Sequence, residues 1–295
     1  MPRSKRKAAG PLVGVEPPAV GAISNLFRGS PAEVAAQFDR HGLECLQLLP
    51  QFAGQFFDSA SDITTRACKE MAKPFKDAQL PIVAVSAHTN FVDPDSPRRR
   101  RQVARFEALL EHCRDFGSRC LVTESGTVNA SRPWDFHQDN QLPATFAQLV
   151  RALKPMVARA EALGVVILVE PHLYHVIGTL EAAVKLREAL GPHLGFVMDP
   201  ANVFTRSMAS ASKKPLRQYF AEIGHACPIA HGKDVRYHGS EWTTPRAGTG
   251  TLDYPEFLTL WSQHHPGGPL ILEQITAAEL EETIDFLDRL FRKKP

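Results

Sequence analysis

Eight short apolar runs, separated by longer stretches of mixed polarity, recur along most of the chain. Several are continuously hydrophobic, as in Val165–Val169, which is typical of parallel strands that are covered on both faces. The centres of the runs lie at Gly21, Leu46, Ala84, Val122, Leu168, Val197, Ala230 and Ile271. From first to last they span 250 of the 295 residues, so one sheet can use nearly the whole chain.

The stretches between the runs have the features of helices. Ser30-Pro31 and Ser96-Pro97 each place a capping residue before a proline at the first helical position. Helices are expected over 32–41, 96–117, 142–163, 179–190 and 278–292. Eight strand–helix units in about 250 residues predict an α/β fold, a single (β/α)8 TIM barrel. A doubly wound open sheet is the main alternative, but no G-x-G-x-x-G follows the first run to support its dinucleotide-binding form.

Composition narrows the class of protein further. The formal charge of +2, from 34 basic and 32 acidic residues, does not indicate a protein that binds nucleic acid over its whole surface. No apolar run approaches the ~20 residues of a membrane span, and no apolar segment follows the basic start to form a secretory signal. Five cysteines without a CxxC pair indicate reduced thiols in a cytoplasmic protein. Residues 1–10 are expected to form a disordered basic tail, and residues 11–295 one barrel domain.

Four of the runs end in side chains that bind cations. The active site of a barrel lies at the C-terminal ends of its strands, and a carboxylate directly after a buried strand is costly unless it is paired or bound to a cation. The four residues are Glu170, Asp199, His231 and Glu273. Three carboxylates and one imidazole suit one divalent ion, Mn²⁺ by preference or Mg²⁺, with Co²⁺, Fe²⁺ and Zn²⁺ as further candidates. The alternative is a structural ring of ion pairs with Lys233, Arg236 and Arg246.

Three more polar residues near strand ends are candidates for substrate binding. His88 and Glu124 end the third and fourth runs, and His172 lies two residues after Glu170. If the chain stays extended there, His172 projects to the same side as Glu170. The alternative roles are a hydrogen-bonded core histidine for His88 and a surface histidine for His172.

Two cations and two indoles are further candidates for substrate binding. Lys233 and Arg236 follow His231 and can hold substrate oxygens or a phosphate, or they are surface charges. Trp134 and Trp242 lie in long loops, where aromatic rings either wall a sugar pocket or pack the loop down.

The run Arg98–Arg101 is the densest concentration of charge in the chain. Four arginines at the start of a helix oppose the helix dipole. Ion pairing with Glu107 or Glu111, or simple solvation, is favoured over a patch that binds phosphate or nucleic acid.

Taken in order, the strand-end motifs resemble a known family. They are E-P-H at the fifth run, D-P-A-N at the sixth, H-G-K-D at the seventh, then G-T-G-T-L-D-Y-P-E-F, and L-I-L-E at the eighth. This set is similar to that of the xylose isomerase-like TIM-barrel superfamily, and more narrowly of its sugar phosphate isomerase/epimerase group. The similarity extends from about Gly14 to Phe291.

The resemblance implies a metal-dependent isomerase or epimerase that acts on a small carbohydrate, a keto-sugar or sugar phosphate. It implies one metal held by Glu170, Asp199, His231 and Glu273, with Glu170 and Glu273 also acting as the acid/base pair. The pair moves a proton on the carbon beside a carbonyl, and the metal stabilises the resulting enediolate. Barrels of this kind often pair, so a homo-oligomer is left open.

One position departs from the family pattern. Members commonly have D-x-x-H at the sixth strand, whereas Asn202 occupies the histidine position here. An asparagine can hydrogen-bond a substrate oxygen but cannot be a charged proton donor. A lyase or dehydratase on a keto-sugar is therefore the runner-up. An apurinic-site endonuclease is disfavoured because three zinc ions need more histidines and a D-x-H after the seventh strand. A non-catalytic barrel is disfavoured because all four ligands are present.

Overall fold

The computed structural model of the protein describes residues 12, 14–57, 59–132, 135–239 and 241–291. Within them, parallel strands close into a barrel in the order β1-β12-β9-β8-β7-β6-β5-β2. These strands are β1 Ala19–Ile23, β2 Cys45–Leu48, β5 Ile82–Ser86, β6 Cys120–Glu124, β7 Val166–Glu170, β8 Leu194–Met198, β9 Ile229–Gly232 and β12 Pro269–Leu272. All eight coincide with the predicted apolar runs, so the (β/α)8 prediction is confirmed.

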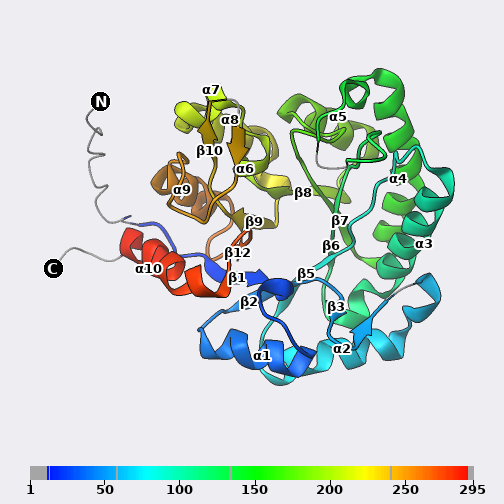
Figure 1. Ribbon diagram of the computed structural model, residues 1–295, viewed down its shortest axis with the longest axis horizontal. Coiled ribbons are helices and arrows are strands. Elements are labelled where there is room, and N and C mark those ends of the chain that lie inside the picture. The colour runs from blue at the N-terminus through cyan, green and yellow to red at the C-terminus, as the bar shows by residue number, and fades with distance from the viewer. Residues whose placement is uncertain (1–11, 13, 58, 133–134, 240, 292–295) are drawn as a thin grey trace.

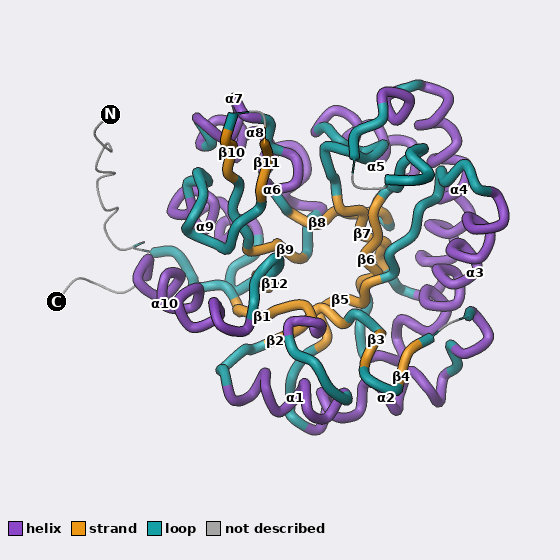
Figure 2. Tube along the Cα trace, in the orientation of Figure 1, coloured by secondary structure: helices purple, strands orange, loops and turns teal. Residues whose placement is uncertain are grey.

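Helices surround the ring of strands on the outside (Figures 1 and 2). The longer ones are α1 Pro31–Arg40, α2 Thr65–Asp77, α3 Ser96–His112, α4 Pro143–Leu163, α5 Leu180–Leu190, α8 Lys213–Ile223, α9 Tyr254–His264 and α10 Leu280–Phe291. The five predicted helices correspond to α1, α3, α4, α5 and α10. The segment predicted over 96–117 divides into α3 and a 3₁₀ turn, Cys113–Phe116. At α1 the Ser30 hydroxyl accepts from the Glu33 amide, and Pro31 stands at the first helical position.

Smaller elements decorate the barrel. Two short helices, α6 Pro200–Val203 and α7 Arg206–Ser210, follow β8, and two hairpins join β3 Gln51–Phe52 to β4 Gln55–Phe56 and β10 Arg236–His238 to β11 Glu241–Thr243. Every helix in the described part of the chain is too short or too polar to cross a membrane. The predicted tail, residues 1–10, lies outside the described residues.

The barrel places a polar layer directly beyond an apolar one. One cluster of buried side chains takes a residue from each of β5 to β9: Ala84, Val122, Leu168, Val197 and Ile229. Because side chains two residues apart lie on the same side of a strand, the residue two positions further on faces the same way. On the last four of these strands those residues are Glu124, Glu170, Asp199 and His231. The strand pattern itself therefore gathers the predicted site residues at the carboxyl end of the barrel.

Candidate metal site

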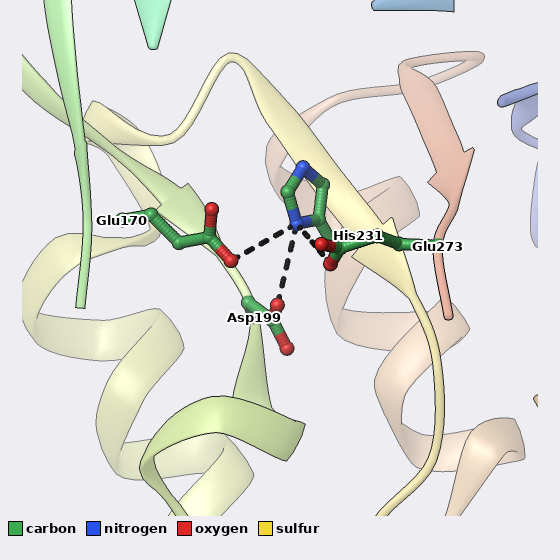
Figure 3. Close-up of side chains that lie close together, drawn as sticks. All are labelled: Glu170, Asp199, His231 and Glu273. Atoms are coloured by element: carbon green, nitrogen blue, oxygen red, sulfur yellow. Dashed lines mark hydrogen bonds and ion pairs between the residues drawn. The ribbon is translucent and has the colours of Figure 1, made fainter. Parts of the chain in front are cut away.

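Three carboxylates converge on one ring nitrogen of His231 (Figure 3). Its Nδ1 lies 3.3 Å from Glu170 Oε1, 3.3 Å from Asp199 Oδ2 and 3.1 Å from Glu273 Oε2. Ligand atoms of all four residues lie within 4.8 Å of one another. The residues come from the ends of four successive barrel strands, β7, β8, β9 and β12. The side chains of His231, Asp199 and Glu170 are at most 7% exposed, whereas that of Glu273 is 20% exposed and opens toward solvent.

Local bonds orient the two carboxylates on β7 and β8. Asp199 is the N-cap of α6, and its Oδ1 accepts the amide hydrogens of Ala201 and Asn202, which leaves Oδ2 to face His231. The side chain of Asn202 donates from Nδ2 to Glu170 Oε1 at 2.6 Å. Pro200 and Pro171 directly follow the two acids and cannot extend the strand ladders.

Gln47 in β2 fixes the tautomer of His231, and the sequence patterns do not single it out. Its Nε2 donates to Ser86 Oγ at 3.0 Å, so its Oε1 faces His231 Nε2, also at 3.0 Å. The proton of a neutral ring must then reside on Nε2, and the lone pair on Nδ1 points at the carboxylates. The set of three oxygens and one imidazole nitrogen therefore fits a divalent cation. The only signal in the sequence is a polar residue inside the apolar run ECLQLL.

Lys233 brings a second positive charge to the cluster. It is buried, and its Nζ lies 2.8 Å from Asp199 Oδ2 and 3.7 Å from Glu170 Oε1 and donates to Glu273 Oε2. Of the proposed ion-pair ring, Lys233 alone takes part: Arg246 pairs with Glu282 at 2.6 Å, and Arg236 makes no ion pair with a described residue. The predicted candidate Lys233 thus lies inside the site and not on the surface.

The charges of the cluster shift one another's pKa values. Burial opposes the charged ring of His231, but Glu170 and Glu273 outweigh it and raise the pKa of His231 well above its usual value. Burial likewise opposes ionisation of Glu273, yet Lys233 and His231 lower its pKa. For Glu170 burial dominates and raises the pKa. The site therefore attracts positive charge to Nδ1, as a cation-binding site must.

His88 and Glu124 form a second polar pair beside the cluster. His88 follows β5 and lies 2.5 Å, through Nδ1, from Oε1 of the buried Glu124 at the end of β6. Glu124 is aligned with Glu170 across the β6–β7 ladder, so the pair begins one strand away from the cluster. Both residues line a cavity of about 430 Å³ that also contacts His175 and Arg98.

The pairing of His88 with Glu124 should be visible in the titration of His88. The His88 side chain is 47% exposed, and the charge of the Glu124 carboxylate raises the pKa of His88 to about 9 from the usual 6.5. Because the folded-state pKa is the higher one, the stabilisation by the pair is present below about pH 6.5 and is lost as the pH rises through 9. We expect NMR of metal-free protein to give this pKa for His88, with Glu124→Gln returning it to near 6.5. His88→Gln assigns the resonance, and a pKa unchanged by Glu124→Gln would contradict the pairing.

Three of the remaining candidates, His172, Trp242 and Arg236, lie within the described residues. His172 is buried just after β7, where its amide donates to Ile177 O. Its ring packs edge-on against Trp242 of β11, with centroids 5.5 Å apart. The indole Nε1 of Trp242 is buried without a hydrogen-bond partner among the described residues. Arg236 is half-buried in β10, and Trp134 lies outside the described residues.

The prediction that Glu107 or Glu111 pairs with the run Arg98–Arg101 is wrong. Arg98 donates from Nη2 to Asp93 Oδ1 at 2.7 Å, and Arg99 donates to the Asp93 carbonyl. Glu111, one of the two expected partners beside Glu107, pairs instead with Arg159 of α4. Asp93 lies in the loop just before α3, five residues from Arg98, so the pair is a local contact between loop and helix that helical spacing does not predict.

The family model of the xylose isomerase-like TIM barrel matches residues 17–290, and the chain belongs to this family. A search of curated protein sequences found no match.

Solved structures share the fold at low sequence identity. A 3-keto-D-glucoside 4-epimerase from E. coli is 17% identical, with a TM-score of 0.65 over 92% of this chain and 99% of that one. A xylose isomerase-like TIM barrel protein from Mycobacterium smegmatis in complex with magnesium is 15% identical, with a TM-score of 0.68 over 96% of this chain and 99% of that one. A probable 3-DHS dehydratase from Bacillus anthracis is 14% identical, with a TM-score of 0.67 over 93% of this chain and 99% of that one. At such identities the likeness establishes the fold alone.

Proposed function

We propose that the protein is a divalent-metal-dependent isomerase or epimerase that moves a proton on the carbon beside the carbonyl of a keto-sugar. The observation that carries the proposal is the convergence of Glu170, Asp199 and Glu273 on Nδ1 of His231. A sugar epimerase with the same fold supports it. When bound there, a divalent ion, Mn²⁺ by preference, supplies Lewis acidity for the charge that develops on the substrate oxygens.

The proposed work of the chain is proton transfer and positioning. Glu170 and Glu273 approach His231 from β7 and from the end of β12, on two sides of the site (Figure 3). Their Oε atoms take the proton from the substrate carbon and return it. Lys233 Nζ, which contacts Asp199 Oδ2 at 2.8 Å, holds a substrate oxygen. We assign further substrate contacts to His88, Glu124, His172, Asn202, Arg236, Trp134 and Trp242.

The second candidate is a lyase or dehydratase that starts with the same deprotonation. The observation that favours it is the bond from Asn202 Nδ2 to Glu170 Oε1, because this amide positions a carboxylate and cannot protonate a substrate oxygen. A dehydratase with the same fold supports it. Product analysis decides between the two: a lyase releases water or another leaving group, and an epimerase returns an isomer of equal mass.

Metal content and proton exchange test the proposal. We expect one divalent ion per chain by mass spectrometry of the purified protein. In a screen of ketopentoses, ketohexoses, their phosphates and keto-glycosides in D₂O with Mn²⁺, at least one compound should take up deuterium beside its carbonyl. Excess EDTA should abolish the uptake and Mn²⁺ restore it. Protein without a stoichiometric ion, together with activity indifferent to EDTA, would refute the proposed function.

Replacing Gln47 should change the affinity of the site for a metal ion. Gln47→Leu should weaken Mn²⁺ binding by about 10–100-fold, since groups that orient a ligating histidine contribute on this scale. Gln47→Glu keeps an acceptor for His231 Nε2 and should lose less. Calorimetric titration with Mn²⁺ measures both, and equal affinities for Gln47→Leu and the wild type would show that Gln47 does not set the ring.

A further inference from the structure

The cavity beside the cluster has its own polar lining. Its volume of about 430 Å³ lies within the range of ~300–1,000 Å³ found for ligand sites. Its wall includes His88 and Glu124 but none of the four cluster residues. Since Glu124 and Glu170 are neighbours across the β6–β7 ladder, a molecule held at the cluster can extend into this cavity over β6 toward β5.

Hydrogen bonds hold the walls of the cavity in place. Asn90 Oδ1 accepts the amide hydrogen of Thr127, and Asn90 Nδ2 donates to the Thr127 carbonyl, so the loops after β5 and β6 are tied together. Gly126 has a φ of +82°, and a Cβ there would lie 2.1 Å from Asn90 Oδ1. Asn140 donates to Thr127 Oγ1 and to the Tyr174 carbonyl, which adds the loop after β7. The cavity is therefore formed before a ligand binds.

The charges of the lining are already neutralised. Arg98 is paired with the buried Asp93 through two of its nitrogens, Nε and Nη2, and His88 is paired with Glu124. The N-terminus of α3 is also satisfied, because Asp95 accepts from the Arg98 amide at 2.8 Å. A phosphate group is recognised by unpaired cations or free helix N-termini. The cavity offers neither among its described residues.

Neutral hydrogen-bond donors remain. Gln102 Oε1 accepts the Asn90 amide hydrogen at 2.7 Å, and Asn129 Oδ1 accepts the Arg132 amide hydrogen at 3.1 Å. The amide nitrogens of Gln102 and Asn129 have no hydrogen-bond partner among the described residues, and both residues line the cavity. Such groups suit hydroxyl and ether oxygens.

On the basis of the proposed function, we propose that this cavity binds a second, uncharged sugar unit of the substrate, while the keto-sugar unit of the same molecule lies at the cluster. The substrate class is then a keto-glycoside or another extended unphosphorylated carbohydrate, and not a sugar phosphate. The reacting unit and the second unit share one molecule, so the cavity contributes to affinity and selectivity and leaves the proton transfer to Glu170 and Glu273.

Binding of simple sugars tests this subsite without turnover. Calorimetry in the presence of Mn²⁺ compares glucose, glucose 6-phosphate, cellobiose, maltose, sucrose and trehalose. At least one disaccharide should bind tenfold or more tightly than glucose, and glucose 6-phosphate should not. The proposal is overturned if none of the four disaccharides binds more tightly than glucose, or if glucose 6-phosphate gains as much as the best of them.

Isosteric variants locate the binding. Gln102→Glu keeps the acceptor for the Asn90 amide and removes the donors, and Asn129→Asp does the same for Arg132. Each should lower the affinity for the best disaccharide about tenfold and leave glucose unchanged. Gln148→Glu carries the same charge change in a groove beside α4 and should have no effect. Equal losses for glucose and disaccharide would overturn the subsite.

These outcomes are separable from failure of the proposed reaction. If no keto-compound exchanges deuterium while the disaccharide preference and its loss in Gln102→Glu persist, the reaction is wrong and the second-sugar subsite stands. If exchange occurs on keto-sugars but no disaccharide preference exists, the subsite is wrong and the reaction stands.

Discussion

Replacing Glu170 or Glu273 by glutamine is expected to lower the rate of proton exchange into the substrate by roughly 10²–10⁴-fold. Glutamine keeps the shape of the side chain and one oxygen that can face a cation, but it has no basic carboxylate to take the proton. The fold should persist, because the buried carboxylate of Glu170 is replaced by a neutral group that still accepts from Asn202 Nδ2.

The measurement must separate proton transfer from metal loss, since both residues also face His231 Nδ1. Deuterium uptake is therefore recorded at Mn²⁺ concentrations that saturate each variant, as established by titration. Glu70→Gln, at an exposed position in α2, is the matched control and should exchange like the wild type. If both site variants, with metal bound, exchange at the wild-type rate, neither residue is the acid or the base.

The barrel and its ligand cluster follow from local patterns. Continuous apolar runs identify strands that are buried on both faces. A carboxylate directly after such a run is costly unless it is paired with a cationic side chain or bound to a metal ion. In Glu170 and Asp199 the following proline also ends the ladder at that residue. Because side chains alternate along a strand, the position of each acid relative to its run already determined that it faces the barrel interior.

The other features depend on contacts between distant segments. Gln47 lies 184 residues from His231 in sequence, and nothing in the run around it shows which ring it meets. The arginines of α3 are a local exception: helical spacing suggests Glu107 or Glu111 as partners, but Asp93, in the loop five residues before Arg98, is the partner in the structure. The role of Lys233 is ambiguous in the sequence because a lysine after a strand is usually solvated. Only the closed barrel brings its ammonium group together with three carboxylates from other strands.

Replacing Lys233 by methionine is expected to destabilise the metal-free protein by about 3–5 kcal/mol and to make its stability depend on divalent metal. Methionine is also long and unbranched, but it removes a charge that lies 2.8 Å from Asp199 Oδ2 and 3.7 Å from Glu170 Oε1. Three carboxylates then remain with His231 alone to compensate them. A divalent cation at the cluster supplies two positive charges and should restore most of the loss, since a ligand that binds only the folded state stabilises it.

Denaturant unfolding with EDTA or with Mn²⁺ measures this exchange of one cation for another. Mn²⁺ should stabilise Lys233→Met more than it stabilises the wild type, and should bind the variant more tightly, because a like charge has been removed from beside the metal. Lys73→Met, which breaks only an exposed pair with Asp77, should change stability by no more than about 0.5 kcal/mol. A metal-free Lys233→Met protein as stable as the wild type would mean that Lys233 does not neutralise the carboxylates. Equal stabilisation of the variant and the wild type by Mn²⁺ would mean that lysine and metal do not compete for the same charge.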